Sequence, residues 1–344
     1  MRICRFTALT VSLFLCQSAL ALAANYYDPY TYSPDANQKQ YTPPQQYVPS
    51  QQYAPQKQYL TKTSPNPSGA AYPAAYENIQ LRPGLYPENT PKPISLGTES
   101  AFDAGVQFAR YLYGEPNVGN PGDTVDVSIR GLKYGAEARG TVAVDEWFMR
   151  AEGRFAFGDD DYKGSGKIDG VADDLAEARF LVGHDFLTNA LGLSPYVGAA
   201  FRDLFNDGRG ISTTGAHGYR RESRYLYVPV GLTTRARIDD DSRMSLNTEY
   251  DQLVWGRQYS HLEDASPVYS TLINTQIWGY GLRGDLMYEH RRWGIGPFFD
   301  YWNIDQSRTA CGSTIYGDYI YTTCGDEPHN FTLEYGIQFR YKLF

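Results

Sequence analysis

The chain ends on the stretch NFTLEYGIQFRYKLF, residues 330–344, in which apolar and polar positions alternate from Phe331 to Leu343. The apolar members are Phe331, Leu333, Tyr335, Ile337, Phe339, Tyr341 and Leu343. A period of two indicates a β-strand with one apolar and one polar face. The stretch is about three times as long as a typical strand of a soluble sheet. A strand that crosses a bilayer in a barrel needs both features, because lipid contacts one face and the lumen the other.

From residue 97 onward the same alternation recurs in ten segments. They lie at 101–113, 123–140, 146–157, 173–186, 194–205, 220–238, 243–256, 276–289, 293–305 and 329–344. The short joins lie near 141–145, 187–193, 239–242 and 290–292, and the long, polar joins near 114–122, 158–172, 206–219, 257–275 and 306–328. This layout predicts an all-β transmembrane antiparallel up-and-down barrel of about ten strands, with both ends in the periplasm. In the second segment the apolar phase changes at Gly131, which predicts a β-bulge.

On these segments, and on the terminal strand that closes at Phe344, residues 97–344 resemble a Gram-negative outer-membrane β-barrel protein. The resemblance implies a place in the outer membrane of a Gram-negative bacterium, with outer-membrane lipid around the barrel. It also implies that the barrel-assembly machinery reads the C-terminal strand. Phe344 shares its parity with Arg340 and Lys342 rather than with the apolar face. Either the register shifts at the end of the strand, or Phe344 lies outside the strand ladder.

The first part of the chain has a different character. Arg2 and Arg5 precede an apolar run that ends in small residues, so residues 1–23 are predicted to be a secretory signal peptide. Residues 24–96 are rich in Tyr, Pro and Gln and contain a hexapeptide array with tyrosines six residues apart. Such a segment cannot bury enough apolar surface to fold alone. We expect a disordered periplasmic arm, which is either a flexible tether or a contact to peptidoglycan or a periplasmic partner.

The net charge argues against one class of partner, and the cysteine content predicts one disulfide. The formal net charge is −8 at pH 7 and there is no basic cluster, which argues against nucleic acid as a partner. Cys311 and Cys324 remain after the signal peptide is removed, and an even count in an oxidising compartment predicts a disulfide. This disulfide would either hold aromatic side chains of the fifth long join outward as a surface contact or protect that long join from proteases. The aromatic side chains are Tyr316, Tyr319 and Tyr321. No motif predicts a metal or a cofactor.

When the polar face of each segment is assigned to the lumen, charges of both signs fall inside. They are Arg150, Glu152, Arg154, Glu177, Arg179, Arg235, Arg237, Glu249, Asp251, Arg283, Asp285, Asp300, Glu334 and Arg340. A ten-stranded barrel is only a little wider than the eight-stranded kind, which side chains just fill. Because an unpartnered buried charge is costly, we expect these groups to pair across the lumen and plug it. The alternative is a small outer-membrane channel or porin.

The enzymatic alternative is a protease at the outer rim. The resemblance in layout extends to the omptins, ten-stranded barrels in which acidic pairs and an Asp–His pair meet at the extracellular rim. The corresponding positions here are Asp159, Asp160 and Asp161 in the second long join, and His261 with Asp264 in the fourth. A carboxylate pair can hold a water while an imidazole takes its proton. The local sequences GDDDY and SHLEDA do not match a protease motif, so we expect the acidic run to be a solvated loop tip. The expected function is therefore a structural or surface-interaction role of the adhesion type.

Overall fold

The computed structural model describes residues 93–116 and 127–344. The predicted signal peptide (1–23), nearly all of the predicted arm (24–96) and residues 117–126 lie outside the described residues. Among the residues that are described, no helix is long and apolar enough to cross a membrane.

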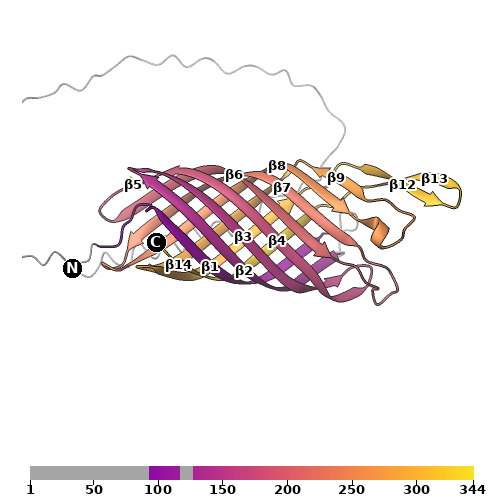
Figure 1. The fold of residues 1–344 in the computed structure, drawn as a ribbon, viewed down its shortest axis with the longest axis horizontal. Helices are drawn as coiled ribbons and strands as arrows, with labels where there is room; N and C mark the ends of the chain where they lie inside the picture. The colour runs from indigo at the N-terminus through magenta and orange to yellow at the C-terminus, as the bar shows by residue number, and fades with distance from the viewer. Residues whose placement is uncertain (1–92, 117–126) are drawn as a thin grey trace, which may run out of the picture. The chain divides into compact units, whose positions relative to one another are not determined.

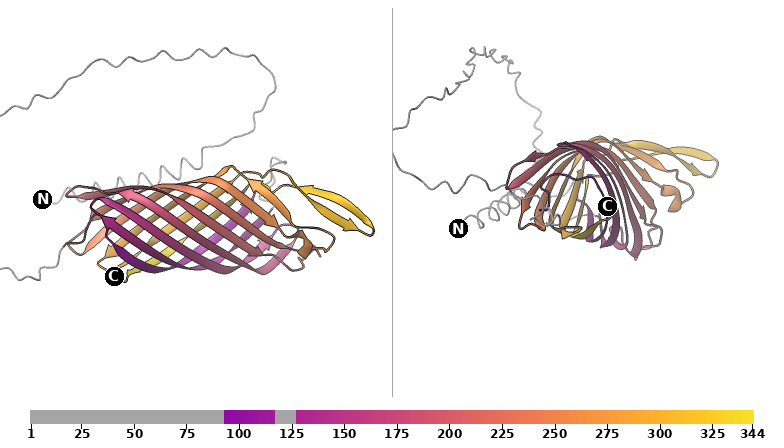
Figure 2. Two further views of the ribbon diagram at one scale, coloured as in Figure 1. Left: turned by 45° about the horizontal axis from the view of Figure 1, so that its top comes forward. Right: turned by 60° about the vertical axis from the view of Figure 1, so that its left-hand side comes forward.

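Ten long antiparallel strands close into a barrel (Figures 1 and 2). In chain order they are β1 (Ala101–Glu115), β2 (Val127–Val144), β3 (Trp147–Lys163), β4 (Lys167–His184), β6 (Leu191–Asp207), β7 (Arg220–Arg237), β8 (Ser242–Ser260), β10 (Gly279–His290), β11 (Trp293–Ile304) and β14 (Asn330–Lys342). Each strand pairs with the next barrel strand in sequence, and β14 returns to pair with β1. The predicted ten-stranded barrel is confirmed. The C-terminus lies at the end with short turns, and the longer loops lie at the other end; by the layout of outer-membrane barrels we assign these as the periplasmic and the outer end.

Four shorter strands and one 3₁₀ turn complete the described part. They are β5 (Phe186–Leu187), η1 (Leu262–Asp264), β9 (Leu272–Gln276), β12 (Ala310–Tyr316) and β13 (Tyr319–Gly325). β9 pairs with the outer end of β8 and β10 continues along the same neighbour, so this crossing of the wall is interrupted at Ile277 and Trp278. β12 and β13 form a hairpin that projects beyond the outer end of the barrel (Figure 1).

A belt of apolar side chains faces outward around the barrel. It includes Phe108, Leu132, Tyr134, Met149, Phe155, Phe157, Phe180, Val197, Leu226, Val230, Ile295, Tyr335 and Ile337. In water this belt would be an exposed apolar surface far larger than soluble monomers carry. An apolar band around a closed barrel is instead the surface that lipid covers. On β14 the outward face carries the alternating apolar residues of the C-terminal stretch, as the sequence predicts.

The predicted bulge at Gly131 is wrong. β2 keeps one continuous register with β1 through this residue. The apolar phase changes because β2 leaves the lipid at this height. Above the belt, Ile129 turns into the lumen and is 4% exposed, while Arg130 faces outward into water. The register shifts lie elsewhere, between Asp160 and Tyr162 in the β3–β4 pair and between Leu226 and Tyr227 in the β7–β8 pair.

The second long join is shorter than predicted. β3 continues to Lys163 and β4 begins at Lys167, so only residues 164–166 form the turn. Most of the predicted join at 158–172 is therefore strand. The acidic run that was expected at a loop tip lies on the outer part of β3.

Phe344 follows the end of β14, which is nearer to the second of the two alternatives, although its carbonyl oxygen still accepts a hydrogen bond from the amide of Phe102 on β1 at 3.0 Å. β14 ends at Lys342, and the ring of Phe344 stacks on Phe102 with 5.6 Å between the ring centroids. Recognition of this end by the barrel-assembly machinery stays a prediction.

Candidate functional site

The charged interior of the barrel is the first candidate site. It forms because every second side chain of each strand faces the lumen, and many of these side chains are charged. All but one of the predicted lumen charges are buried or half-buried on the inward face of the barrel wall. The exception is Arg237, the last residue of β7, and its assignment to the lumen is wrong. Its side chain is exposed at the periplasmic rim, because Arg237 lies at the end of the wall, and it donates to the carbonyl oxygen of Ile94 at 3.1 Å.

Ion pairs that centre on Arg283 of β10 cross the middle of the lumen. The guanidinium group donates to both oxygens of Glu177 on β4, at 2.9 and 2.8 Å. Three further carboxylates lie close to it, Glu249 at 3.3 Å, Asp300 at 3.4 Å and Asp251 at 3.8 Å. Arg283 thus connects four strands, β4, β8, β10 and β11, through buried charges.

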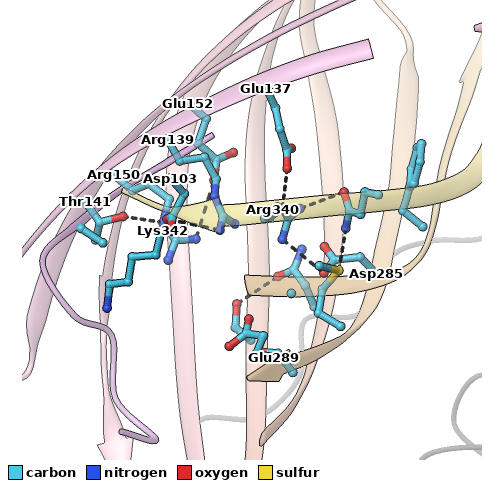
Figure 3. A pocket seen from close by; sticks show the side chains of 18 of the residues that line it. Asp103, Glu137, Arg139, Thr141, Arg150, Glu152, Asp285, Glu289, Arg340 and Lys342 are labelled. Carbon is cyan, nitrogen blue, oxygen red and sulfur yellow. Dashed lines mark hydrogen bonds and ion pairs between the residues drawn. The ribbon is translucent and has the colours of Figure 1, made fainter. Parts of the chain in front are cut away.

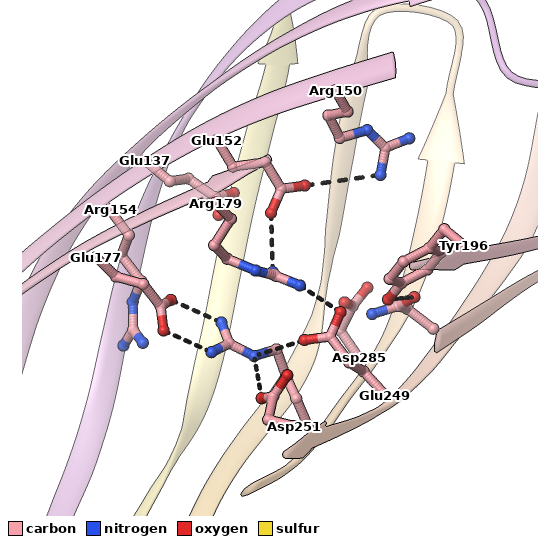
Figure 4. Close-up of polar contacts among 12 residues, drawn as sticks. Glu137, Arg150, Glu152, Arg154, Glu177, Arg179, Tyr196, Glu249, Asp251 and Asp285 are labelled. Carbon is pink, nitrogen blue, oxygen red and sulfur yellow. Dashed lines mark hydrogen bonds and ion pairs between the residues drawn. The ribbon is translucent and has the colours of Figure 1, made fainter. Parts of the chain in front are cut away.

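A second set of ion pairs extends this network around the wall (Figure 4). Arg179 of β4 donates to Glu152 of β3 at 2.8 Å and also bonds Glu249. On the neighbouring strand β6, Arg202 donates to Asp300 of β11 at 2.9 Å. Arg154 of β3 pairs with Glu334 of β14 and lies 3.4 Å from Asp300. Buried salt bridges therefore fill the middle of the barrel, as the sequence predicts for a plugged lumen.

An aromatic layer lies on the outer side of these ion pairs. Trp302 of β11 is 1% exposed, and its ring meets the edge of Tyr227 at 4.9 Å and stacks on Tyr225 at 6.1 Å between centroids. The guanidinium carbon of Arg202 lies 5.3 Å from the centroid of the same indole. The hydroxyl of Tyr227 donates to Glu177 at 2.7 Å, which joins the aromatic layer to the ion pairs.

On the periplasmic side of the ion pairs the lumen opens into a vestibule of about 160 Å³ (Figure 3). On one side, Arg340 of β14 donates to Glu137 of β2 at 2.5 Å and lies 3.7 Å from Asp285. On the other side, Arg150 of β3 donates to the hydroxyl oxygen of Thr141 at 3.2 Å.

The residues just before β1 are held at the periplasmic end of the barrel. The amide of Ile94 donates to the carbonyl oxygen of Asp240 at 2.7 Å. The amide and the hydroxyl of Thr98 donate to the two carboxylate oxygens of Asp185, at 2.5 and 3.0 Å. The vestibule wall therefore includes side chains from residues 94–98, a segment that contains the predicted boundary between arm and barrel.

On the outer side of the aromatic layer, the mouth of the barrel holds a second cavity of about 270 Å³. Arg221 of β7 lies in its wall, donates to Glu115 at 2.9 Å and to the hydroxyl of Tyr113 at 3.0 Å, and pairs with Glu327. The aromatic layer and the ion pairs lie between this cavity and the vestibule.

The acidic candidates for a rim protease do not form a carboxylate pair. Asp159 and Asp161 point outward and are exposed, whereas Asp160 points inward and is fully buried. The carboxylate of Asp160 lies 3.4 Å from the ammonium of Lys133, which also bonds Asp173. The expectation of a solvated acidic tip is therefore wrong for Asp160, because β3 continues beyond the point where a loop was predicted.

The histidine candidate is engaged by other partners. His261 Nδ1 lies 3.0 Å from Glu263 Oε1 and 3.2 Å from Thr271 Oγ1. Asp264 instead accepts hydrogen bonds from the guanidinium of Arg220, at 2.7 and 2.9 Å. These bonds hold the pKa of the Asp264 carboxyl below its usual range. Each member of the predicted Asp–His pair thus has a partner of its own.

The hairpin β12–β13 is the second candidate site. The predicted disulfide between Cys311 and Cys324 is confirmed, and the two residues are register partners. Near the turn, Tyr319 is 69% exposed and Ile320 is 75% exposed. Tyr321 and Ile315 are exposed as well. The side chain of Tyr316, the third predicted contact residue, lies outside the described part of the structure.

Sequence reasoning missed several interior groups. These are Lys133, Glu137, Arg139, Arg202, Asp173, Arg243 and Glu289, together with the rings of Tyr225, Tyr227 and Trp302. In β2 the assumed bulge hid the parity, since Lys133, Glu137 and Arg139 all share the inward face once the register is continuous. Arg202 shares its face with Tyr196 and Ala200, so strict parity along β6 could have found it.

A closed barrel with an apolar outer belt and a charged interior is typical of proteins that span an outer membrane. The chain therefore has the architecture of an outer-membrane β-barrel protein, the kind that lies in the outer membrane of Gram-negative bacteria. No family model matches the sequence, and no curated protein matches it.

Solved outer-membrane barrels are similar to the chain in fold. The outer membrane protease OmpT from Escherichia coli is 10% identical, with a TM-score of 0.48 over 72% of this chain and 98% of that chain. The translocator domain of the autotransporter NalP from Neisseria meningitidis is 8% identical, with a TM-score of 0.33 over 71% and 89%. The attachment invasion locus protein Ail of Yersinia pestis is 10% identical, with a TM-score of 0.24 over 71% and 100%.

Proposed function

We propose that this barrel is a surface-interaction protein of the adhesion type, which binds its partner through the hairpin β12–β13. The observation that carries the proposal is the exposure of large apolar side chains near the hairpin tip, led by Ile320 at 75%. These groups lie on the projecting hairpin, outside the barrel wall that lipid surrounds (Figure 1). Apolar groups that stay exposed to water on a projecting element are typical of an interaction surface.

The hairpin is also held in a defined shape, which favours binding. The disulfide closes its base, and the hydroxyls of Thr314 and Thr323 bond across the two strands. The amide of Ile315 donates to the carbonyl oxygen of Val268 in the fourth outer loop at 2.8 Å. Rigid aromatic side chains lose little conformational entropy on binding. A preformed hairpin with exposed tyrosines therefore suits recognition of another surface.

Binding by intact cells tests this role directly. Expressing cells are compared for attachment to immobilised fibronectin, collagen and mucin, and for attachment to one another. We expect the triple variant Tyr319→Ser, Ile320→Ser and Tyr321→Ser to lose at least about tenfold of the strongest attachment, because several exposed contacts of about 1 kcal/mol or more each are removed.

The matched control for the hairpin is Ile211→Ser. Ile211 is 66% exposed in the third outer loop and is also apolar. Attachment of this variant should equal that of the wild type, and both variants should keep the heat-dependent gel mobility of a folded barrel. If the triple variant attaches to every surface as well as the wild type does, the hairpin is not the contact and the proposal is rejected.

Conductance measurements separate this role from that of a channel. Purified protein in planar lipid bilayers is expected to show no steady single-channel conductance, because buried ion pairs and aromatic rings cross the bore between the two cavities. Wide aqueous channels occur in barrels with more strands. Regular conductance steps, reproduced after repurification, would contradict the plugged lumen and favour the channel.

A further inference from the structure

Three arginines in the vestibule wall lack a close carboxylate partner. The shortest N–O distances are 3.4 Å for Arg139 to Asp103, 3.6 Å for Arg150 to Glu152 and 4.0 Å for Arg235 to Asp185. By contrast, the hydrogen bonds from Arg283 to its carboxylate in the middle of the lumen are 2.8 and 2.9 Å. The vestibule arginines are therefore less well neutralised than those of the ion-pair layer.

Two of the three carboxylates nearest to these arginines are already engaged by other donors, and the third, Asp103, accepts only the 3.4 Å contact from Arg139 among the described residues. Glu152 accepts from Arg179 at 2.8 Å. Asp185 accepts from the amide of Thr98 at 2.5 Å, from the Thr98 hydroxyl at 3.0 Å and from the hydroxyl of Ser194. Arg235 is only 4% exposed, and its Nε has no hydrogen-bond partner among the described residues. A buried guanidinium donor without an acceptor is costly.

The same arginines also act on one another as like charges. The charge of Arg150 is repelled by those of Arg139 and Arg340. The charge of Arg235 is repelled by those of Arg150 and Arg243. All five line the vestibule. Repulsion between partly enclosed cations is strong because water screens it poorly there. An anion between them would relieve this repulsion and supply the missing acceptors.

We propose that the vestibule binds a small oxyanion, a carboxylate or phosphate group that enters from the periplasm. Guanidinium groups bind both kinds of oxyanion, often through two parallel hydrogen bonds. The cavity of about 160 Å³ has room for such a group. Arg292 lies at its periplasmic rim beside the ion pair of Lys342 and Glu99, and the positive charge of Arg292 attracts anions. This site is independent of the role proposed for the hairpin.

Calorimetric titration of the purified full-length protein in detergent at low ionic strength tests the site. The two probes are inorganic phosphate and citrate, which separate phosphate from carboxylate chemistry. At least one of them is expected to bind saturably, and Arg150→Gln is expected to weaken that binding at least about tenfold, the loss of one charge-assisted interaction. Removing Arg150 leaves Glu152 bonded to Arg179, so the fold should be kept.

The matched control is Arg237→Gln, because Arg237 is exposed outside the vestibule. Its affinity for either anion should equal that of the wild type. A second vestibule variant, Arg139→Gln, should weaken binding as Arg150→Gln does, and all variants should keep the gel mobility of the folded barrel. Saturable binding that is equal in the wild type and in both vestibule variants would overturn the proposal. So would the absence of saturable heat with both anions.

Discussion

Replacing Arg283 by alanine is expected to lower the stability of the folded barrel by about 3–5 kcal/mol, the typical cost of removing one partner from a buried ion pair. The side chain of Arg283 is 12% exposed, and those of its carboxylate neighbours are at most 2% exposed. Without the guanidinium group, Glu177 loses both of its bonds to Arg283. Several carboxylates would then face one another across the lumen with too little positive charge between them.

Urea titration in detergent micelles, followed by the gel mobility of the folded barrel, measures this loss. The control is Arg291→Ala, since Arg291 pairs with Asp241 at 2.6 Å but is 50% exposed. A surface pair contributes about 0–1 kcal/mol, so this variant should unfold close to the wild type. Equal unfolding midpoints for the two arginine variants would show that the central network contributes nothing to stability.

A double variant separates the charge effect from a packing effect. Arg283→Ala combined with Glu177→Gln is expected to be more stable than Arg283→Ala alone, because one of the unpaired carboxylates is then neutral. If lost packing were the cause, removing the charge of Glu177 would not restore any stability.

The fold was predictable because a single physical rule acts along most of the chain. Within the lipid, a strand must place apolar side chains outward, so alternation identifies both the strand and its inward face. The ten strands and nearly all the predicted lumen charges follow from this rule. The prediction fails for Arg237 because this residue is the last of β7, at the rim where its side chain reaches water, and parity alone does not indicate where the wall ends.

The errors lie where the strands leave the lipid. Around Gly131 the apolar face passes from the outside to the inside, because water replaces lipid as the outer solvent and the interior becomes the drier side. The same alternate residues of β2 face the lumen along the whole strand, but the apolar side chains change from the outward to the inward face. In the sequence this change looks like a β-bulge. The burial of Asp160 has the same cause, since its contact with Lys133 depends on the pairing of β2 with β3 above the belt. Which charged side chains pair across the lumen depends on how the barrel closes, and the pattern of a single strand does not predict this.

Trp302→Ala is expected to cost about 3–5 kcal/mol of stability, as for other large-to-small changes in a packed interior. The ring of Trp302 packs against Tyr225, Tyr227 and Arg202 at the top of the ion pairs. The control is Trp293→Ala on the same strand, because Trp293 is 37% exposed at the periplasmic rim and should cause a smaller loss. Urea titration of both variants in one detergent gives the comparison. A loss no larger for Trp302 than for Trp293 would contradict a packed aromatic layer.

The conductance of the same variant tells which layer closes the lumen. Trp302→Ala widens only the space on the outer side of the ion pairs, where a cavity of about 40 Å³ already adjoins the ring. The salt bridges of Arg283 and Arg202 still cross the bore beneath it. We therefore expect a barrel that unfolds more easily but still conducts no ions. Steady conductance in Trp302→Ala would mean that the aromatic layer, rather than the buried charge, is the barrier between the outer mouth and the periplasmic vestibule.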